Sequence, residues 1–354
     1  MLILTLNLGS TSSKVAIFED ETEQYSVTVR HDAALLAQAK MPAQQLGFRK
    51  ENIYAAIEKA GYKFTDFDAV CSRAGVLKPI ESGTYIIDDN VLRDAQDIEL
   101  GGRQPHGLGM VIAKAIHDEF GVPAYFCDPV STDELPEVAK VTGFEGMERT
   151  SRFHALNQKA VARKCAAAIG RPYEELNLVG IHLGGGTSVA AHEHGRCVEI
   201  HDCGEEGAFS MDRCGHLPTN QLIDYCFGGK SKSDIKFTLR REGGVFSYLG
   251  TSDMLEVENR ALAGDAKAKL IYDAFIYQHV KCAGEMAAVM HFKVDAFFIT
   301  GGIAFSKIIV ERLRSYLEEL APVYVFPGEE EMRSLAEGAL RVLRKETEAK
   351  VYQG

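Results

Sequence analysis

The sequence predicts an α/β protein built from two similar halves. Short apolar runs of strand length alternate with segments of helical period along the whole chain, which is typical of α/β folds. The 354 residues suit two domains of roughly 150 residues each rather than one small core. The segments LNLGSTSSKVAIF and IHLGGGTSVAAHEHG share one plan, an apolar strand, a Gly-rich turn bearing Ser or Thr, and a second strand. Such a recurrence in the two halves indicates a duplicated fold.

The first half is expected to open with the two strands LILTLNL and SKVAIF, because each is apolar and Gly and Ser separate them. The following segments alternate between the sequence periodicity of a helix and that of a strand. They are a helix near Pro42 to Ala60, strand DAVCS, a helix near Leu108 to Phe120, and strand PAYFC. Asp133 and Glu134 are expected to start a further helix.

The second half is expected to begin with a helix near His154 to Ala168, which Gly170 and Pro172 stop. Strands LVGIHL and SVAAH come next. The remaining elements are a long helix near Ala266 to Met290, strand AFFIT, a helix after Ser306, strand PVYVF, and a last helix from about Glu331 to Glu348.

Charge and composition argue against nucleic-acid and membrane partners and indicate a cytoplasmic protein. The balance of 39 Lys and Arg against 50 Asp and Glu gives a net charge of -11, which repels nucleic acid and anionic lipid. The start MLILTLNLGS reads as a strand rather than a signal peptide, and no window offers the ~20 apolar residues of a membrane span. The eight cysteines form no CxxC pair, which argues against structural zinc and indicates reduced thiols in a cytoplasmic protein.

The two Gly-rich turns are candidate phosphate sites. A tight Gly-Ser or Gly-Gly-Thr turn leaves backbone N–H groups and hydroxyls to face an anion. An ordinary hairpin turn is the alternative, and the recurrence of the motif favours phosphate. Neither GxxxxGK[ST] nor GxGxxG is present, so no P-loop or dinucleotide motif is indicated. The polar residues of the first turn are Asn7, Ser10, Thr11, Ser12 and Lys14.

Several long segments in the same order resemble the acetokinase family, and within it the butyrate kinase branch. They are SRAGVLKPIESGTY, DPVSTDELPEVAKVTG, RFHALNQKAVAR, YEELNLVGIHLGGGTSVAAHEHGR, FSMDRCGHLP and ITGGIAFS. The wider superfamily contains actin, hexokinase and the chaperone ATPases. The resemblance implies two duplicated ribonuclease H-like domains with an active-site cleft between them. The first would span 1–150, completed by 330–354, and the second 151–329.

The resemblance also implies four catalytic residues. Arg73 and Arg213 correspond to cations at the acyl phosphate, where a guanidinium can hold carboxylate or phosphoryl oxygens through paired bonds; a surface ion pair is the alternative. His154, at a helix N-terminus, corresponds to the histidine that stabilises the phosphoryl group in flight. Asp128 would hold Mg²⁺ or orient the carboxylate, and a turn-forming Asp before Pro129 is the alternative.

The resemblance further implies that ATP or ADP and Mg²⁺ are bound. His182 either faces the ligand or packs in the core. The metal is assigned to Asn7 and Glu331, although Glu329 and Glu330 adjoin Glu331 and leave the register open. The implied nucleotide-binding residues are Asn7, Ser10, Ser12, Lys14, His182, Gly184, Gly185, Gly186, Thr187, Gly301 and Gly302.

The predicted activity is transfer of a phosphoryl group between ATP and butyrate or a related short or branched fatty acid, in a homodimer or larger homo-oligomer. The branch usually reads RGG where this chain has Arg73, Ala74 and Gly75, and GEGPFS where it has GEEGAFS from Gly204 to Ser210. Acyl preference therefore stays open, with acetate or propionate kinase as alternatives. A chaperone-like regulatory ATPase is the alternative from another class. A sugar kinase would need an Asp base for a hydroxyl acceptor.

Overall fold

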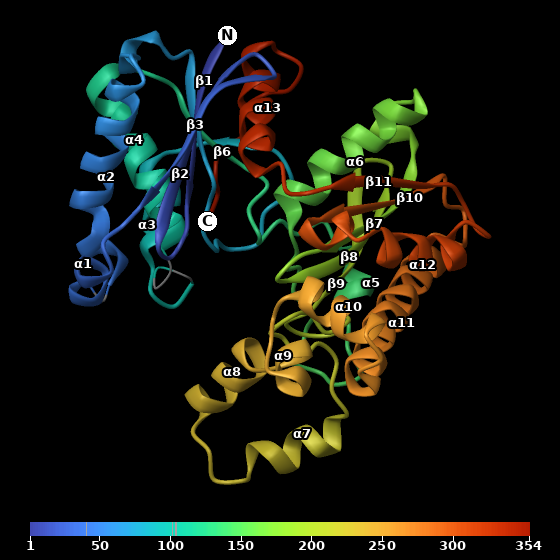
Figure 1. Cartoon of the computed structure of the whole chain (residues 1–354). Helices are drawn as coiled ribbons and strands as arrows, with labels where there is room; N and C mark the ends of the chain where they lie inside the picture. Colours follow the sequence, from blue (N-terminus) through green and yellow to red (C-terminus); the bar gives the residue numbers. More distant parts are fainter. Residues whose placement is uncertain (40, 101, 103–104) are drawn as a thin grey trace. The chain divides into compact units, whose positions relative to one another are not determined.

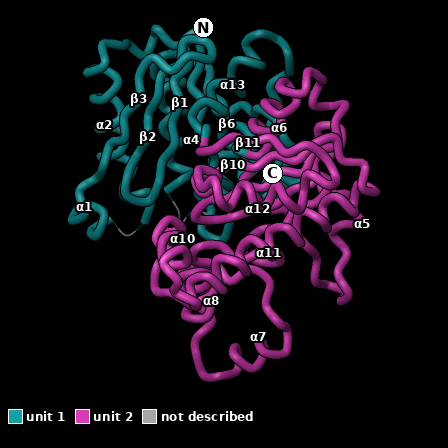
Figure 2. Tube along the Cα trace, turned by 45° about the vertical axis from the view of Figure 1, so that its right-hand side comes forward, with its two compact units in different colours: residues 1–133, 155–157, 330–354 teal, residues 134–154, 158–329 magenta. Residues whose placement is uncertain are grey.

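The computed structural model describes residues 1–39, 41–100, 102 and 105–354. The chain divides into two compact units, which are coloured separately in Figure 2. Unit 1 comprises 1–133, 155–157 and 330–354, and unit 2 comprises 134–154 and 158–329. Each unit contains one sheet covered by helices (Figure 1).

The sheet of unit 1 has the strand order β3-β2-β1-β4-β6-β5. Its first three strands form an antiparallel meander, β4 and β6 continue parallel to β1, and β5 closes the edge antiparallel to β6. The strands are β1 (Leu2–Leu8), β2 (Ser12–Glu19), β3 (Thr22–Arg30), β4 (Ala69–Ser72), β5 (Thr84–Ile86) and β6 (Ala124–Cys127).

Helices cover both faces of this sheet because β1 is apolar on both of its faces. Leu4, Leu6 and Leu8 pack with the helices on one face, whereas Ile3 packs with the C-terminal helix on the other. Figure 1 shows α2 and α4 on one side of the strands and α13 on the other. The helices are α1 (Ala33–Gln38), α2 (Pro42–Lys59), α3 (Asp89–Gln96), α4 (Leu108–Phe120) and α13 (Glu331–Leu343), with short 3₁₀ turns at Phe64–Asp66 and Pro105–Gly107.

The sheet of unit 2 has the order β11-β10-β7-β8-β9. Its strands are β7 (Asn177–Leu183), β8 (Thr187–Glu193), β9 (Arg196–Asp202), β10 (Ala296–Gly301) and β11 (Val323–Pro327). Its helices are α5 (Glu137–Lys140), α6 (Ala155–Ile169), α7 (Thr219–Cys226), α8 (Lys232–Arg241), α9 (Gly244–Leu249), α10 (Met254–Leu262), α11 (Ala266–Val289) and α12 (Lys307–Leu317), with 3₁₀ turns at Tyr173–Glu175 and Gly302–Phe305. The first three residues of α6, 155–157, are counted with unit 1.

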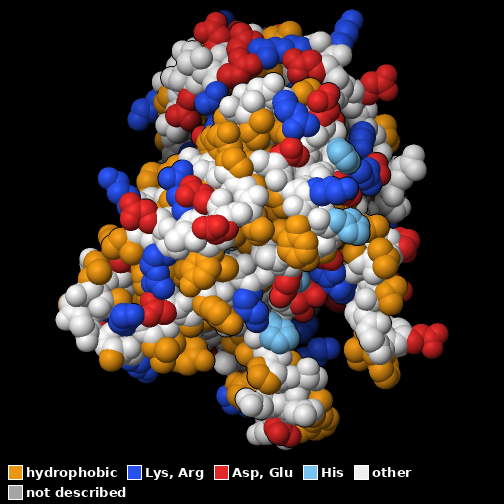
Figure 3. Space-filling model, turned by 90° about the vertical axis from the view of Figure 1, so that its right-hand side faces the viewer, with side chains coloured by type: hydrophobic (Ala, Val, Ile, Leu, Met, Phe, Trp, Pro, Cys, Tyr) orange, Lys and Arg blue, Asp and Glu red, His pale blue; other side chains and the backbone are white. Residues whose placement is uncertain are grey.

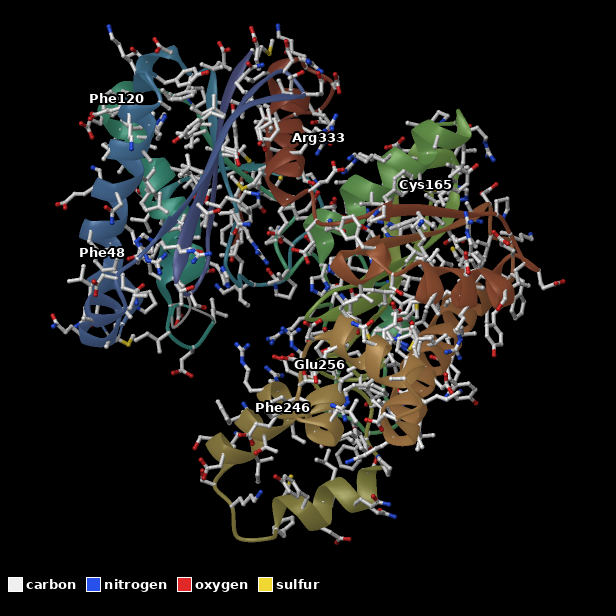
Figure 4. All side chains as sticks on the ribbon, in the orientation of Figure 1. Phe48, Phe120, Cys165, Phe246, Glu256 and Arg333 are labelled. Carbon is white, nitrogen blue, oxygen red and sulfur yellow. The ribbon has the colours of Figure 1, made fainter. Side chains whose placement is uncertain are left out.

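Two apolar clusters hold this second sheet. Cys165 of α6, labelled in Figure 4, packs with Leu178 and Phe298 on one face. On the other face, Ile181 packs with Phe275 of α11. The long helix is thus buried along one side, as its apolar sequence predicts.

The duplicated α/β fold predicted from the sequence is confirmed. Read from the meander, unit 1 runs β3-β2-β1-β4-β6 and unit 2 runs β9-β8-β7-β10-β11. In both units, three antiparallel strands are followed by two parallel strands. These two strands run parallel to β1 in unit 1 and to β7 in unit 2. The two Gly-rich turns therefore occupy equivalent positions, between β1 and β2 and between β7 and β8.

Two sequence expectations about helix ends are wrong. Asp133 and Glu134 do not start a helix, because α5 begins only after Pro136 and Glu134 is instead buried in an ion pair with Lys159. The last helix ends at Leu343 rather than Glu348, where its run of buried apolar residues stops and Lys345 takes a left-handed φ of 61°.

Acidification is expected to destabilise the fold through buried neutral histidines. Burial, assisted by the nearby Arg73 charge, lowers the pKa of His106 to about 4, and burial lowers the pKa of His279 to about 4. The unfolded chain takes up these protons near pH 6.5, whereas the native chain does not. The contribution of the two neutral histidines to stability is therefore fully present above pH 6.5 and is lost as pH falls towards 4. The free energy of unfolding should fall by about 2 kcal/mol per group between pH 7 and 5.

Urea unfolding at pH 7, 6 and 5 measures this effect, with His279→Leu as the variant that removes one titrating group. The variant should have a shallower dependence of unfolding free energy on pH. An unchanged slope would assign the acid sensitivity to other groups.

Candidate active site

The first Gly-rich turn is built from the β1–β2 hairpin of unit 1. The N–H of Gly9 donates to the Ser12 carbonyl oxygen at 2.8 Å and closes the turn. The register pairs Asn7 with Lys14 across the two strands. Ser10 and Lys14 are exposed, so a hydroxyl and an ammonium group lie at the surface beside the turn. This set can bind an anion such as phosphate.

Arg49 of α2 supports this turn from behind, and the sequence did not single it out. It is fully buried, and its guanidinium donates to the Ser10 carbonyl oxygen at 2.9 Å, the Ser12 carbonyl oxygen at 3.3 Å and the Ser13 hydroxyl at 3.2 Å. Burial lowers the pKa of Arg49. The sequence did contain a sign that Arg49 is buried, because this residue lies four positions before Ile53 on the buried stripe of the helix.

Three predicted residues of unit 1 meet beside the turn. Asn7 Nδ2 donates to Glu331 Oε2 at 2.6 Å, and Arg73 Nη1 donates to the same oxygen at 3.0 Å. Arg73 also lies 3.5 Å from Asn7 Oδ1. Glu331 is therefore the acidic residue that bonds to both Asn7 and Arg73, and its assignment to the metal stays a prediction. Its neighbour Glu330 lies 4.0 Å from Arg333, which Figure 4 labels on α13.

Asp128 is placed against a different loop of unit 1. It follows β6 with a left-handed φ of 40° and is 2% exposed. Its Oδ1 accepts bonds from the Ser82 hydroxyl at 2.6 Å and the Gly83 N–H at 2.9 Å. The carboxylate therefore fixes the ESG segment, in addition to any contact with a ligand.

The second Gly-rich turn brings together predicted residues of unit 2. Gly184 N–H donates to the Gly186 carbonyl oxygen at 3.0 Å and closes the turn between β7 and β8. A Cβ on Gly186 would lie 2.6 Å from Arg213 Nη1 and 3.3 Å from His154 Cε1. The missing side chain thus lets the guanidinium and the imidazole lie directly against the turn. Thr187 is buried, and its hydroxyl faces the Ala208 carbonyl oxygen at 3.5 Å.

His154 and His182 form one stacked pair. Their ring centroids are 4.0 Å apart and the ring planes differ by 15°. His154 precedes α6, and its Nδ1 lies 2.9 Å from the Ser188 hydroxyl. His182 Nε2 lies 3.6 Å from Glu329 Oε1, so Glu329 belongs to this turn while Glu331 belongs to the other.

Acidic groups and a thiol surround Arg213. Its Nη1 lies 3.4 Å from Cys203 Sγ, and its Nε lies 3.8 Å from Asp212 Oδ1. Burial raises the pKa of the Asp202 carboxyl, although the charge of Arg213 opposes the shift. Burial also raises the pKa of the Cys203 thiol. The guanidinium is therefore held in a partly buried setting where its charge is weakly screened.

A cavity of about 830 Å³ adjoins the second turn within unit 2. Gly301 has a φ of 92°, and a Cβ there would lie 2.2 Å from the Leu183 carbonyl oxygen, so the position requires glycine. A Cβ at Gly302 would meet no described atom within 4 Å, which leaves its backbone open to a ligand. The lining residues include Gly184, Gly185, Met254, Leu255, Glu258, Gly302, Ile303, Phe305 and Ser306.

Among the described residues, one further cluster of side chains has the composition and spacing to hold a metal ion. The ligand atoms of His201, Cys282 and Glu285, on β9 and α11, lie within 4.8 Å of one another. His201 Nδ1 and Glu285 Oε2 are 3.2 Å apart and form an ion pair when the imidazole is protonated. No sequence pattern had indicated this set.

The surface carries charges of both signs. On the face shown in Figure 3, basic and acidic side chains are interspersed with small groups of apolar ones. Within the described part of the chain, no helix combines the length and the apolar character needed to cross a membrane.

Comparison with known proteins identifies close relatives. Residues 142–339 match the model of the acetokinase family. A protein of Clostridium botulinum (strain Alaska E43 / Type E3) named "Probable butyrate kinase" is 42% identical over 354 residues, which covers 99% of this chain and 99% of that protein.

Two solved structures share the fold. The acetate kinase of Porphyromonas gingivalis has a TM-score of 0.79 at 19% identity, covering 97% of this chain and 99% of its own. A propionate kinase from Francisella tularensis subsp. tularensis SCHU S4 has a TM-score of 0.78 at 18% identity, covering 95% and 98%. At these identities the likeness concerns the fold.

Proposed function

Since the chain belongs to the acetokinase family, we propose that it transfers a phosphoryl group between ATP and the carboxylate of butyrate or a related short or branched fatty acid. The products of the forward reaction are ADP and an acyl phosphate. The observation that carries the proposal is that each unit holds an arginine beside its Gly-rich turn, Arg73 next to Asn7 and Arg213 against Gly186. Such a pairing of guanidinium and phosphate turn suits an acyl phosphate.

The nucleotide is assigned to unit 2. A cavity of about 830 Å³ is within the range of small-molecule sites and has room for a nucleoside. Its apolar wall, with Met254 and Leu255 of α10, suits a purine ring. The open backbone at Gly302 and the turn at Gly184 to Gly186 adjoin the cavity and would receive the ribose and phosphates.

Catalysis in this proposal is positioning and charge neutralisation. A carboxylate is already a nucleophile, so no strong general base is needed. Arg73 is assigned to the acid and its acyl phosphate, while Arg213 and His154 donate to the oxygens of the transferring phosphoryl group. Ser10, Ser12 and Lys14 are assigned to phosphate. Asp128 is assigned to the acid side of the reaction through the ESG loop that it holds.

Magnesium is assigned to the Asn7 and Glu331 pair. Asn7 Oδ1 and the Glu331 carboxylate oxygens are of the ligand type that Mg²⁺ prefers. Asn7 Nδ2 and Arg73 Nη1 both donate to Glu331 Oε2, so Oε1 is the carboxylate oxygen that these two donors leave for the cation. When bound, Mg²⁺ would neutralise phosphate charge. Removal of divalent metal with a chelator should abolish the reaction.

The family likeness also leads us to propose a cytoplasmic homodimer or larger homo-oligomer. All eight cysteines lie among the described residues and none forms a disulfide, which suits a reducing compartment. Sedimentation equilibrium would measure the oligomer size.

The function is tested by trapping acyl phosphate with hydroxylamine. Hydroxamate that appears only when acid is added identifies a carboxylate kinase, whereas phosphate release independent of acid would identify a regulatory ATPase instead. The same assay, run on acetate, propionate, butyrate and isobutyrate, gives kcat/KM for each acid.

Acids of about four carbons are expected to exceed acetate in kcat/KM. Each buried methylene contributes about 0.8 kcal/mol, so two more carbons favour butyrate by roughly tenfold. The departures from the family pattern at Ala74 and Ala208 are both buried, 2% and 5% exposed, and so affect packing rather than surface contacts. Acetate values equal to or above those of butyrate and isobutyrate would refute the butyrate preference and leave the carboxylate kinase.

A further inference from the structure

A buried chain of polar side chains lies behind His154 in unit 2. It consists of Ser188, Gln158, His192 and Tyr173, which are 2%, 0%, 0% and 4% exposed. These residues come from β8, α6 and the 3₁₀ turn after α6. None of them is in the set predicted from the sequence. Buried polar groups cost stability unless they are hydrogen-bonded, so their pattern of bonds is informative.

The contacts run without a break from Tyr173 to His154. The Tyr173 hydroxyl lies 2.7 Å from His192 Nδ1, and His192 Nε2 lies 3.3 Å from Gln158 Oε1. Gln158 Nε2 lies 3.1 Å from the Ser188 carbonyl oxygen. The Ser188 hydroxyl lies 2.9 Å from His154 Nδ1.

The direction of these bonds follows from the two carbonyl oxygens beside Gln158. Gln158 Nε2 faces the Ser188 oxygen at 3.1 Å and the Gly180 oxygen at 3.4 Å, and both can only accept. The amide nitrogen must therefore point towards them, which turns Oε1 towards His192. Because Oε1 can only accept, His192 must carry its proton on Nε2.

The remaining bonds agree with this assignment. Burial, with the charges of Lys159 and Arg163, lowers the pKa of His192 well below its ordinary value, so the ring is neutral and has one N–H. With that proton on Nε2, Nδ1 accepts the bond from the Tyr173 hydroxyl. Cys197 Sγ also lies 3.4 Å from Nδ1 and 3.9 Å from Nε2, and its thiol is a weak donor that can share the Nδ1 acceptor with Tyr173. The roles of Tyr173, His192 and Gln158 as donors or acceptors are then mutually consistent.

The Ser188 hydroxyl is oriented in the same way. Two donors approach its oxygen at 3.5 Å, the Gln158 amide and the His154 backbone N–H. The hydroxyl proton is therefore directed towards His154 Nδ1 at 2.9 Å. A nitrogen that accepts a bond in a neutral imidazole leaves the proton on the other nitrogen, Nε2. The Cε1 edge of this ring, which joins the two nitrogens, faces the Gly186 turn.

We propose that Ser188, Gln158 and His192 are positioning residues that hold His154 with its proton on Nε2, ready to donate to a phosphoryl oxygen. The fixed tautomer is a property of the fold, whereas its use on a phosphoryl group rests on the proposed function. The chain acts through hydrogen-bond direction, because each neighbour fixes the donor or acceptor role of the next.

The tautomer can be measured directly in full-length protein labelled with ¹⁵N-histidine. NMR distinguishes protonation at Nδ1 from protonation at Nε2, and the signal of His154 is assigned by its loss in His154→Gln. The wild-type protein should show the Nε2–H form of His154. Ser188→Ala and Gln158→Leu should each give a mixture of both forms.

Kinetics supply the second readout. Ser188→Ala and Gln158→Leu should lower kcat by roughly ten- to a hundredfold with little change in the KM for ATP, the range seen when outer hydrogen-bond partners are removed. Tyr173→Phe removes the far end of the chain and should act in the same direction with a smaller effect. Its matched control is Tyr352→Phe, because the buried Tyr352 hydroxyl bonds to Asp94 at 2.7 Å in unit 1. The control should leave both readouts unchanged.

The proposal is overturned if His154 keeps its Nε2–H form in Ser188→Ala, or if Tyr173→Phe and Tyr352→Phe have the same effect on kcat. Should Gln158→Leu fail to fold, the Ser188 and Tyr173 variants still decide the matter. Failure of the wild-type protein to form acyl hydroxamate would refute the proposed function alone, since the NMR readout needs no substrate.

Discussion

Replacing Arg213 by Ala is expected to lower kcat by roughly a hundred- to a thousandfold, as does the loss of one preorganised donor to a transition state. Arg213 lies against Gly186 and is flanked by Asp202 and Asp212, so its charge is held beside the phosphate turn. A contact made only in the transition state lowers kcat and kcat/KM together. Arg73→Ala should act similarly, because it removes the cation that contacts both Asn7 and Glu331.

Steady-state kinetics at saturating ATP and acid measure both variants. Arg213→Lys keeps the charge but loses the planar fork, and it should recover only part of the rate. Arg171→Ala is the matched control, because Arg171 forms an exposed ion pair with Asp295 at 2.9 Å. Wild-type kcat in Arg73→Ala and Arg213→Ala would show that neither arginine acts on the reacting group.

The central part of the fold could be predicted because strands such as β1 and β7 are buried on both faces and are followed by glycine. Strand β7 with the turn at Gly184 to Gly186 is the clearest example, since a run of buried residues ends where the chain must turn. Strands β3, β5 and β9 and helices α1, α3 and α10 were not predicted, and neither were the three helices α7, α8 and α9. Few of their residues are buried, so no apolar stripe marks them, and α7 has none among its described residues.

Only those site residues that belong to sequence motifs could be predicted. Motifs indicated Arg73, Arg213 and His154, and the structure places each beside a Gly-rich turn or its neighbours. The hydrogen bond between Glu331 and Asn7 is visible only in the fold, because the two residues are 324 positions apart in the sequence. The supporting residues Arg49 and Gln158 were missed for the same reason. Their partners are distant in sequence, and neither residue type is a motif by itself.

The wrong expectation for Glu134 has a physical cause with a measurable consequence. An acidic residue after Pro and Ser reads as a helix start, yet Glu134 is 5% exposed at its side chain and lies 2.6 Å from Lys159 Nζ, which is 1% exposed. Glu134 also accepts the Cys197 N–H at 2.7 Å, and Lys159 donates to the Gly195 carbonyl oxygen at 2.8 Å. This buried pair ties α6, which follows His154, to the strand β9.

Lys159→Met is therefore expected to destabilise unit 2 by roughly 3–5 kcal/mol, because it leaves the Glu134 carboxylate buried without its counter-ion. The double variant Lys159→Met/Glu134→Gln should recover most of this loss, since the amide oxygen of Gln still accepts from Cys197 N–H and no buried charge remains. The exposed pair Lys269–Asp273 provides the control, and Lys269→Met should cost less than about 1 kcal/mol. Urea unfolding followed by far-UV circular dichroism suits this chain, which lacks tryptophan, and hydrogen exchange of β9 locates the effect in unit 2. A double variant as unstable as Lys159→Met would show that packing of the lysine stem, rather than the unpaired charge, determines the loss.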